Sequence, residues 1–272
     1  MTTSPSPAAV ERLADGLLLT RLEGGVAELR IDRPEARNAL SVAIFAGLTA
    51  FWKRVDDDAT INAVILTSSD CGTFCAGMDL KEAARLKQET GRDIMAFIED
   101  PFQRTMRSVK KPLIAAMTGS FTAGGMMLSL MCDLRIGLAG TQGGIAEVKV
   151  GRGSPWAVPL LWMMPQPVLM EMTLTGDFMP IERLHRIGFV NDVAATPDEV
   201  RARALALAQR IAENAPLSVR AGKESLMHAA AVGAEQGLDD AVEIYRKVYT
   251  SEDAQEGMRA FAEKRKPRWQ GR

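Results

Sequence analysis

The sequence predicts an α/β protein in which parallel strands alternate with helices, followed by a helical C-terminal region. Short apolar runs typical of buried strands, such as Asn62–Thr67 and Leu113–Met117, are separated by segments with helical spacing up to about residue 138. This order of strand, crossover helix and strand favours parallel pairing. After about Pro155 the pattern changes, and nearly all later segments are helical and rich in Ala, Arg and Glu.

The chain divides into three parts by composition and pattern. We expect a disordered N-terminus over residues 1–14, an α/β core over 15–195 and a helical region over 196–272. No linker rich in Pro and Ser separates the core from the helical region. The apolar stripes of the C-terminal helices either meet a second copy of the chain or fold back on the core, and the sequence leaves both open.

The elements of the core follow from local signals. Alternation in Leu17–Leu22 and Val26–Ile31 around two glycines predicts a β-hairpin. A loop at 33–37 precedes an amphipathic helix that runs to about Val55 and is capped by Asn38 or Ser41. The remaining assignments are a loop at 71–77, helices at Asp79–Gln88 and Asp93–Ser108, a strand at Leu134–Leu138, and helices at Arg183–Ile187, Pro197–Asn214, Leu217–Ala231 and Leu238–Tyr249.

Composition excludes several classes of function. The 272 residues are 47% hydrophobic and 25% charged, which is typical of a soluble globular protein. The net charge is −1 and no dense basic stripe precedes the C-terminus, so we expect no nucleic-acid partner. No apolar run reaches the length of about 18 residues that a membrane span needs, and the N-terminus has neither a secretory nor a transit pattern. We therefore expect a cytoplasmic protein without a membrane partner.

The few cysteines and histidines argue against two common kinds of site. Cys71, Cys75 and Cys132 form no disulfide framework and lack the partners for a zinc site, which favours reduced, mostly buried thiols. His185 and His228 are the two histidines, and neither lies in a glycine-rich or nucleophile-elbow context. The sequence therefore disfavours catalysis by histidine and predicts no metal site.

Gly124 and Gly125 lie at the junction between the strand Leu113–Met117 and the helical run Met126–Met131. Two glycines there let the backbone turn tightly and admit a ligand close to main-chain N–H groups. The first N–H groups of a helix lack intrahelical partners and carry the positive end of the helix dipole. The junction therefore suits an anion, or an oxygen that becomes one during a reaction. The alternative is a tight turn packed in the core.

Two carboxylates stand alone between Asp100 and Glu171, namely Asp133 and Glu147. Asp133 closes the helical run after the glycine pair, and we expect a structural role. Glu147 is flanked by apolar residues and turn glycines. In an apolar pocket its pKa would rise and it would carry protons near neutral pH. The alternative is a surface glutamate paired with Lys149.

Eight stretches of the chain, in order, match motifs of a known family. They are IDRPEARNALS (31–41), TFCAGMDLKE (73–82), KPLIAAMTGSFTAGG (111–125), CDLRI (132–136), AEVKVG (146–151), MEMTLTGD (170–177), GFVNDV (188–193) and EGMRAFAEKRKP (256–267). By these motifs the chain resembles the crotonase superfamily, in its enoyl-CoA hydratase/isomerase family. The resemblance implies a spiral core of ββα repeats, a C-terminal trimerisation region, an acyl-CoA substrate and a homotrimer or dimer of trimers. It implies no separate cofactor, since coenzyme A is part of the substrate.

The resemblance also assigns roles to residues. The N–H groups of Met78 and Gly124 would bind the thioester carbonyl oxygen and stabilise the enolate that forms from it, and Glu147 would move the proton. Residues at positions that match the family's coenzyme A contacts are Arg33, Ala36, Ala76, Leu80, Phe261 and Lys264, the last two often reaching the nucleotide from a neighbouring subunit.

The chain departs from the family pattern where mechanism is decided. Hydratases of the family carry two glutamates, and here Met127 occupies the first position while Glu147 retains the second. Because methionine cannot accept a proton, a double-bond isomerisation with one shuttling glutamate fits better than ordinary hydration. Hydration by Glu147 alone, lyase or decarboxylase chemistry, and a weakly catalytic binder of CoA thioesters are the alternatives. Residues 153–158 replace a glycine-rich turn, and the many methionines nearby either shape a pocket for a bulky acyl group or fill the core.

Overall fold

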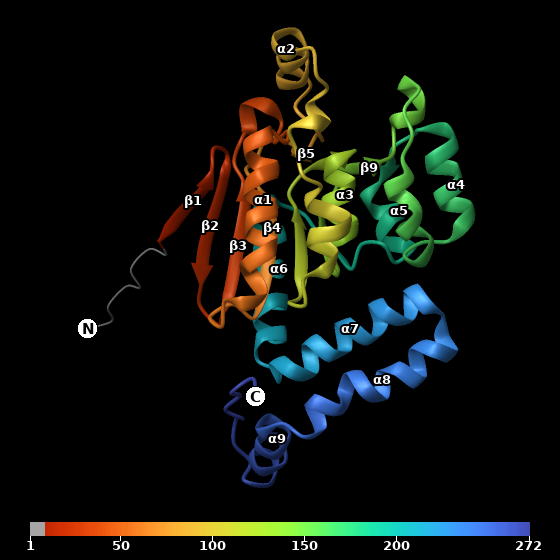
Figure 1. The fold of residues 1–272 in the computed structure, drawn as a ribbon. Helices are drawn as coiled ribbons and strands as arrows, with labels where there is room; N and C mark the ends of the chain where they lie inside the picture. Colours follow the sequence, from red (N-terminus) through yellow and green to blue (C-terminus); the bar gives the residue numbers. More distant parts are fainter. Residues whose placement is uncertain (1–8) are drawn as a thin grey trace.

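The computed structural model describes residues 9–272, apart from the side chain of Val150. Its strands form two sheets, one of seven strands in the order β1-β2-β3-β4-β6-β8-β11 and one of four in the order β10-β9-β7-β5 (Figure 1). The strands are β1 (Val10–Ala14), β2 (Leu17–Leu22), β3 (Val26–Ile31), β4 (Ala63–Ser68), β5 (Thr73–Cys75), β6 (Leu113–Met117), β7 (Ser120–Thr122), β8 (Leu134–Leu138), β9 (Gln142–Gly144), β10 (Met179–Pro180) and β11 (Asp192–Ala194).

The large sheet combines a hairpin with a parallel half. β2 pairs antiparallel with β3 with the predicted bounds, and β1 extends this edge. β3, β4, β6, β8 and β11 then pair in parallel. The α/β prediction and the predicted hairpin are both confirmed.

The middle of the chain repeats a strand–strand–helix unit. In each unit one strand enters the large sheet, the next enters the small sheet and a helix follows, as in β4–β5–α2 and β6–β7–α3. This is the ββα repeat that the family resemblance implies. The α-helices are α1 (Val42–Arg54), α2 (Leu80–Thr90), α3 (Gly124–Met131), α4 (Gln166–Thr175), α5 (Ile181–Arg186), α6 (Pro197–Ala212), α7 (Pro216–Val232), α8 (Ala234–Tyr249) and α9 (Glu252–Ala262).

Two apolar clusters cover the faces of the large sheet. The larger cluster joins β2, β3, α1 and α3 with the small sheet. The second lies under α6, where Val200, Ala204 and Ala208 recur every fourth residue and pack on Ile65 and Ile114 of the sheet. The predicted helical region 196–272 therefore begins with a helix that belongs to the core layer.

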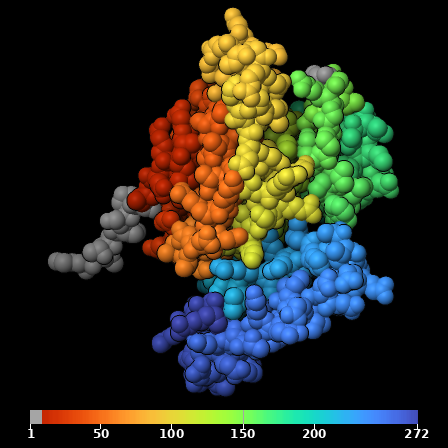
Figure 2. All heavy atoms as spheres, viewed as in Figure 1, coloured from red at the N-terminus to blue at the C-terminus, as the bar shows by residue number. Residues whose placement is uncertain are grey.

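Helices α7, α8 and α9 form an arm below this body (Figures 1 and 2). α7 and α8 run side by side, and His228 Nε2 of α7 lies 2.6 Å from Asp240 Oδ2 of α8. Several large apolar side chains of the arm are exposed, namely Leu226, Leu238, Val242, Tyr249, Met258 and Phe261. That this arm mediates trimerisation stays a prediction.

Four expectations about local structure need correction. Residues 10–14, predicted to be disordered, form β1 because they pair with β2, whereas residues 1–8 lie outside the described residues. The predicted helix at Asp93–Ser108 is instead a series of short 3₁₀ and π turns, since Pro101 cannot continue an α-helix. The loop predicted at 71–77 contains β5. Ser41, not Asn38, caps α1, through a bond from Ile44 N at 3.3 Å.

None of the helices in the described part of the chain is both long and apolar enough to cross a membrane.

Candidate active site

The three predicted catalytic groups follow three neighbouring strands of the small sheet. β5, β7 and β9 pair in parallel in this order, with β7 in the middle. Met78 comes three residues after the end of β5, Gly124 two after β7 and Glu147 three after β9. Because the carboxyl ends of parallel strands meet at one edge of a sheet, the topology gathers these residues at a single edge.

The Met78 amide is turned outward by the strand beside it. Leu40 pairs with Met78 in a parallel bridge, in which Leu40 N donates to Gly77 O at 2.7 Å and Asp79 N donates to Leu40 O at 3.0 Å. Since successive peptide groups of an extended chain point in opposite directions, the Met78 N–H points away from Leu40. Within residues 9–272 it donates to no other group, which leaves it free for a ligand.

The Met78 and Gly124 amides are close together because their neighbours touch. A Cβ placed on Gly77 would lie 3.2 Å from Gly124 N, and one placed on Gly124 would lie 3.6 Å from the carbonyl carbon of Gly77, the atom bonded to Met78 N. Gly77 also has a φ of 95°, a conformation that favours glycine. The two predicted donors of an oxyanion hole therefore lie side by side.

The turn into α3 is tight on both sides of the glycine pair. Ala123, the N-cap residue of α3, has a φ of 47° and makes no side-chain cap. Such a backbone costs a residue with a Cβ about 1–3 kcal/mol. A Cβ on Gly125 would overlap the Cys75 carbonyl oxygen, so α3 packs directly on β5. The glycine pair is packed in the core, and Gly124 also begins α3; that its N–H binds an oxygen stays a prediction.

Glu147 is a half-buried carboxylate, and one of its two oxygens accepts no hydrogen bond in the described part of the chain. This oxygen, Oε2, is buried. Burial raises the pKa of Glu147 above its ordinary value, and the N–H groups of Glu147 and Ala146 and the Trp156 side chain oppose part of this rise. No hydrogen bond of ordinary geometry joins Trp156 to Glu147 among residues 9–272. A carboxylate of this kind suits proton transfer.

The structural alternatives for the two isolated carboxylates are now decided. Lys149 Nζ lies 2.7 Å from Asp177 Oδ1, so the pairing of Lys149 with Glu147 is wrong. Asp133 has the expected structural role, because its Oδ2 accepts bonds from Leu113 N at 2.7 Å and from Lys223 Nζ at 2.8 Å.

The surroundings of the predicted oxyanion hole are apolar. Met127 is the residue of α3 that stays partly exposed while the other seven are buried. Trp156, in the stretch that replaces a glycine-rich turn, is 8% exposed and packs in the larger core cluster. Met117 and Met126 are fully buried in that cluster, so for these two methionines core filling is the role observed.

The predicted coenzyme A contacts fall into two groups. Arg33, Ala36, Ala76 and Leu80 lie in the two segments that meet at the Leu40–Met78 bridge, and Leu80 is 72% exposed. The Arg33 guanidinium is already engaged, with Nη1 3.0 Å from Asp79 Oδ2 and 2.9 Å from Ala39 O. Phe261 and Lys264, by contrast, lie at the α9 end of the arm, at the opposite end of the molecule from α2 (Figure 1).

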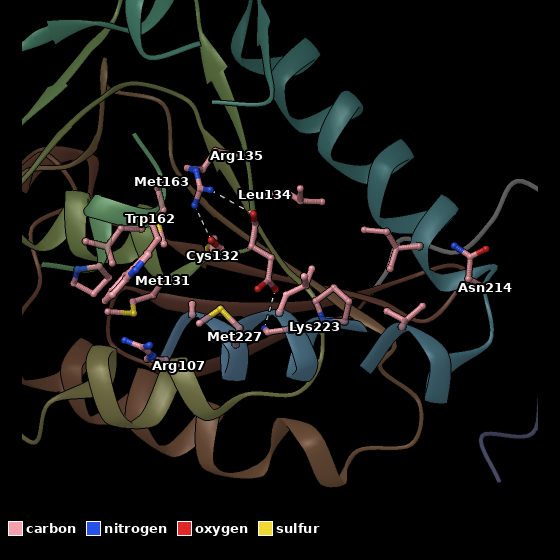
Figure 3. A pocket seen from close by; sticks show the side chains of 18 residues that line it. Arg107, Met131, Cys132, Leu134, Arg135, Trp162, Met163, Asn214, Lys223 and Met227 are labelled. Carbon is pink, nitrogen blue, oxygen red and sulfur yellow. Dashed lines mark hydrogen bonds and ion pairs between the residues drawn. The ribbon is translucent and has the colours of Figure 1, made fainter. Parts of the chain in front are cut away.

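A depression distinct from this edge lies between α7 and the body (Figure 3). It encloses about 530 Å³ and is lined by Met131, Trp162, Met163 and Met227, with Asp133 and Lys223 at its wall. Neither Met78, Gly124 nor Glu147 lines it. Its aspartate and lysine pair with each other, so it lacks the unpaired carboxylate of the edge.

The two histidines are hydrogen-bonded elsewhere, and two of the three cysteines are unreactive. His185 is exposed and lies 2.9 Å from Val190 O, and His228 pairs with Asp240. Cys71, Cys75 and Cys132 are free, and burial raises the pKa of Cys75 and of Cys132 to about 12, which leaves both as unreactive thiols.

Asn38 is the residue of this region that the sequence analysis missed. It is fully buried, has a φ of 53° and binds three separate segments through its side chain. Its only signal in the sequence is an asparagine just before an apolar pair in a loop, for which helix capping by Asn38 or Ser41 is the interpretation given above.

Known proteins share both this sequence pattern and this fold. The family described as Enoyl-CoA hydratase/isomerase matches residues 21–272. The chain is 35% identical to the (E)-benzylidenesuccinyl-CoA hydratase of Thauera aromatica, over 90% of this chain and 96% of that one. It is 34% identical to the enoyl-CoA hydratase EchA19 of Mycobacterium tuberculosis, over 97% of this chain and 100% of that one.

Solved structures agree. An enoyl-CoA hydratase from Mycobacterium tuberculosis superposes with a TM-score of 0.83 at 36% identity, covering 94% of this chain and 99% of that one. One from Bacillus anthracis superposes with a TM-score of 0.86 at 28% identity, covering 94% and 100%. The predicted crotonase-like fold is confirmed, and with whole-length matches in both sequence and structure the chain belongs to the enoyl-CoA hydratase/isomerase family.

Proposed function

We propose that this protein acts on acyl-CoA thioesters through an enolate-like intermediate, with Glu147 as its single proton-carrying residue. The observation that supports this most is the meeting of two free N–H groups, of Met78 and Gly124, with a half-buried, unpaired carboxylate at one edge of the small sheet. Donors that are fixed before the reaction stabilise a developing oxyanion without reorganisation, at about 3–4 kcal/mol for each donor.

The first half of the reaction is the formation of the enolate. The thioester carbonyl oxygen would accept hydrogen bonds from the Met78 and Gly124 N–H groups. The Glu147 carboxylate would remove a proton from C2, and the electron pair of the C–H bond would move into the carbonyl to give the enolate oxygen. The start of α3 adds its positive dipole end on the same side.

The second half follows from the number of carboxylates. When the substrate carries a double bond between C3 and C4, the enolate is conjugated, and Glu147 can return the same proton at C4. The double bond then lies between C2 and C3, and no water is consumed. Met127 can neither donate nor accept a proton, so a reaction that one carboxylate completes is the one this site supports best.

Hydration is the second candidate, because the two relatives described above are named hydratases. In that reaction water adds at C3 of a 2-enoyl thioester and a proton adds at C2. Ordinary two-carboxylate hydration needs one group to activate water and another to deliver the proton. With Met127 in the first position, Glu147 would have to serve both steps, which predicts slower hydration than isomerisation.

The experiment that decides between these reactions is a substrate panel. The protein is incubated with trans-3-enoyl-CoA and trans-2-enoyl-CoA thioesters of several chain lengths and with aromatic acyl groups, and the products are separated and identified. We expect the shifted double bond to form faster than the hydrated product. Hydration as the dominant reaction would favour the second candidate, and cleavage or loss of carbon dioxide would indicate lyase or decarboxylase chemistry. Binding without turnover of any thioester would contradict an enzymatic role.

A further inference from the structure

We propose that Asn38 is a positioning residue that holds the Met78 N–H in its outward orientation. This inference rests on the proposed role of that N–H as an oxyanion donor. Asn38 lies two residues before Leu40, in the segment that pairs with residues 76–79. It is fully buried. Its amide therefore needs internal partners, and the structure supplies them.

The Asn38 side chain binds the segments on either side of it. Nδ2 donates to Ser69 O and to Thr73 O, both at 2.8 Å, and lies 3.3 Å from Cys71 Sγ. Oδ1 accepts a bond from Arg33 N at 3.1 Å. Ser69 and Thr73 flank the turn that leads from β4 into β5, so one amide fixes both the start of β5 and the loop after β3.

The Asn38 backbone adds a second restraint. Its φ of 53° is a left-handed conformation, which asparagine tolerates better than most residues. Asn38 N also donates to Arg33 O at 2.8 Å, which closes the loop on itself. The turn at Asn38 thereby aims the next two residues along the segment that follows β5.

The two segments then join around Met78. Ala76 N donates to Arg37 O at 3.2 Å, before the two bonds that Leu40 makes to Gly77 and Asp79. The Asn38 side chain thus holds the start of β5 by a hydrogen bond, and main-chain bonds to Arg37 and Leu40 hold the residues that follow the end of β5. Loss of the Asn38 amide would free β5 at its start and Leu40 at its side, and the Met78 N–H would lose its fixed direction.

Two substitutions of Asn38 distinguish a role of its side-chain hydrogen bonds from a role of its left-handed backbone conformation alone. Asn38→Asp keeps the shape, the acceptor and the tolerance of a left-handed φ, but it loses both amide donors. Asn38→Gly keeps only the tolerance of that φ. If the backbone conformation alone mattered, glycine would restore function. If the amide bonds hold the hole, both variants lose it.

The experiment measures the polarisation of the substrate carbonyl together with turnover. A thioester with ¹³C at the carbonyl is bound to Glu147→Gln protein, which slows turnover, and the shift of its carbonyl stretching frequency from that of the free thioester is recorded by infrared difference spectroscopy. The same shift is measured with Asn38→Asp and Asn38→Gly added. In proteins that keep Glu147, kcat and KM are measured for the best substrate. Thr67→Val is the control, since it removes one buried bond, to Ala116 O at 3.0 Å, outside these segments.

We expect both Asn38 variants to lose at least half of the carbonyl shift and to lower kcat about 10- to 100-fold, with KM within threefold. Thr67→Val should change neither the shift nor kcat. The inference is overturned if either Asn38 variant that folds keeps the full carbonyl shift and turnover. A thioester that shows no shift when bound to Glu147→Gln protein with Asn38 intact would instead overturn the oxyanion hole itself, and with it the proposed function.

Discussion

Leu40 and Met78 form a parallel β-bridge, in which both main-chain hydrogen bonds of Leu40 go to the residues on either side of Met78. These residues are Gly77 and Asp79. The N–H of Met78 is thereby left out of the pairing and points away from Leu40. A main-chain donor needs no particular side chain, which explains how a methionine can occupy this position. The orientation of the donor depends instead on the segment around Leu40, far from it in sequence.

Substitution of the two adjacent glycines should have unequal effects. A Cβ on Gly125 would overlap the backbone oxygen of Cys75, which cannot move without shifting β5, whereas a Cβ on Gly124 first meets the flexible Leu40 side chain at 2.9 Å. We expect Gly125→Ala to lower the free energy of unfolding by about 1–3 kcal/mol and Gly124→Ala by less. Denaturant unfolding of both variants measures this. Equal losses would show that α3 does not pack on β5 as described.

The stability of the protein should fall with rising pH through Glu147. Burial raises the folded-state pKa of Glu147 above its ordinary value of 4.5. Between these two values the folded state retains a proton that the unfolded state has released, so the free energy of unfolding falls as pH rises through that window. Glu147→Gln removes this loss.

Denaturant unfolding at pH 5 and pH 8 tests the sign. We expect Glu147→Gln to become more stable relative to the natural protein as pH rises. A difference that stays constant, or that changes in favour of the natural protein, contradicts a raised pKa. The same shift places the acid limb of kcat/KM above pH 4.5, because proton removal from C2 needs the ionised carboxylate.

Met127→Glu should increase hydration relative to isomerisation. The substitution supplies a second carboxylate at the start of α3, at the position where hydratases of the family carry one. Activation of water by a positioned base contributes about 10²- to 10⁴-fold, so we expect the ratio of hydrated to isomerised product to rise by about tenfold or more. Product analysis after incubation with a 2-enoyl and a 3-enoyl thioester gives this ratio. Met127→Gln is the matched control, since it is polar but cannot take a proton, and an equal rise with Gln would contradict the role of the carboxylate.

Phe261 should contribute to binding of the nucleotide part of coenzyme A from a neighbouring subunit. Its side chain is 88% exposed on α9, a helix at the opposite end of the molecule from α2 (Figure 1). We expect Phe261→Ala to raise KM about tenfold, or about 1.4 kcal/mol, with kcat unchanged. Met258→Ala on the same helix, where Met258 is 63% exposed, is the control. An unchanged KM, or a protein that is monomeric in analytical ultracentrifugation and fully active, would contradict this role.

The large sheet could be predicted from the sequence because its strands are long enough to show a pattern. β2, β3, β4, β6 and β8 have five or six residues each, and their apolar runs are visible. The small sheet was missed because β5, β7 and β9 have three residues each, and β9 is Gln-Gly-Gly, which has no apolar alternation. The strands that bring the site together are therefore the ones with no sequence signal.

The residues of the candidate site likewise differ in whether the sequence alone indicates them. Gly124 and Glu147 stood out by residue type, the first as a glycine at a strand–helix junction and the second as an isolated carboxylate. Met78 was assigned through the family resemblance, because a main-chain donor leaves no mark on the side chain at its position. For Asn38 the sequence indicates only one of two candidate helix caps, since its bonds to Ser69 and Thr73 depend on tertiary contacts that no local pattern contains.

The most direct test of the account is the rate of double-bond isomerisation by Glu147→Gln, with Glu224→Gln, an exposed glutamate on α7, as the control. Both variants are first shown to bind the thioester with unchanged affinity and with the carbonyl shift described above, so that the oxyanion hole is known to be intact. We predict that Glu147→Gln lowers kcat about 10²- to 10⁴-fold and that Glu224→Gln leaves it unchanged. Turnover by Glu147→Gln at the rate of the natural protein, on every thioester that the natural protein converts, would contradict the central claim.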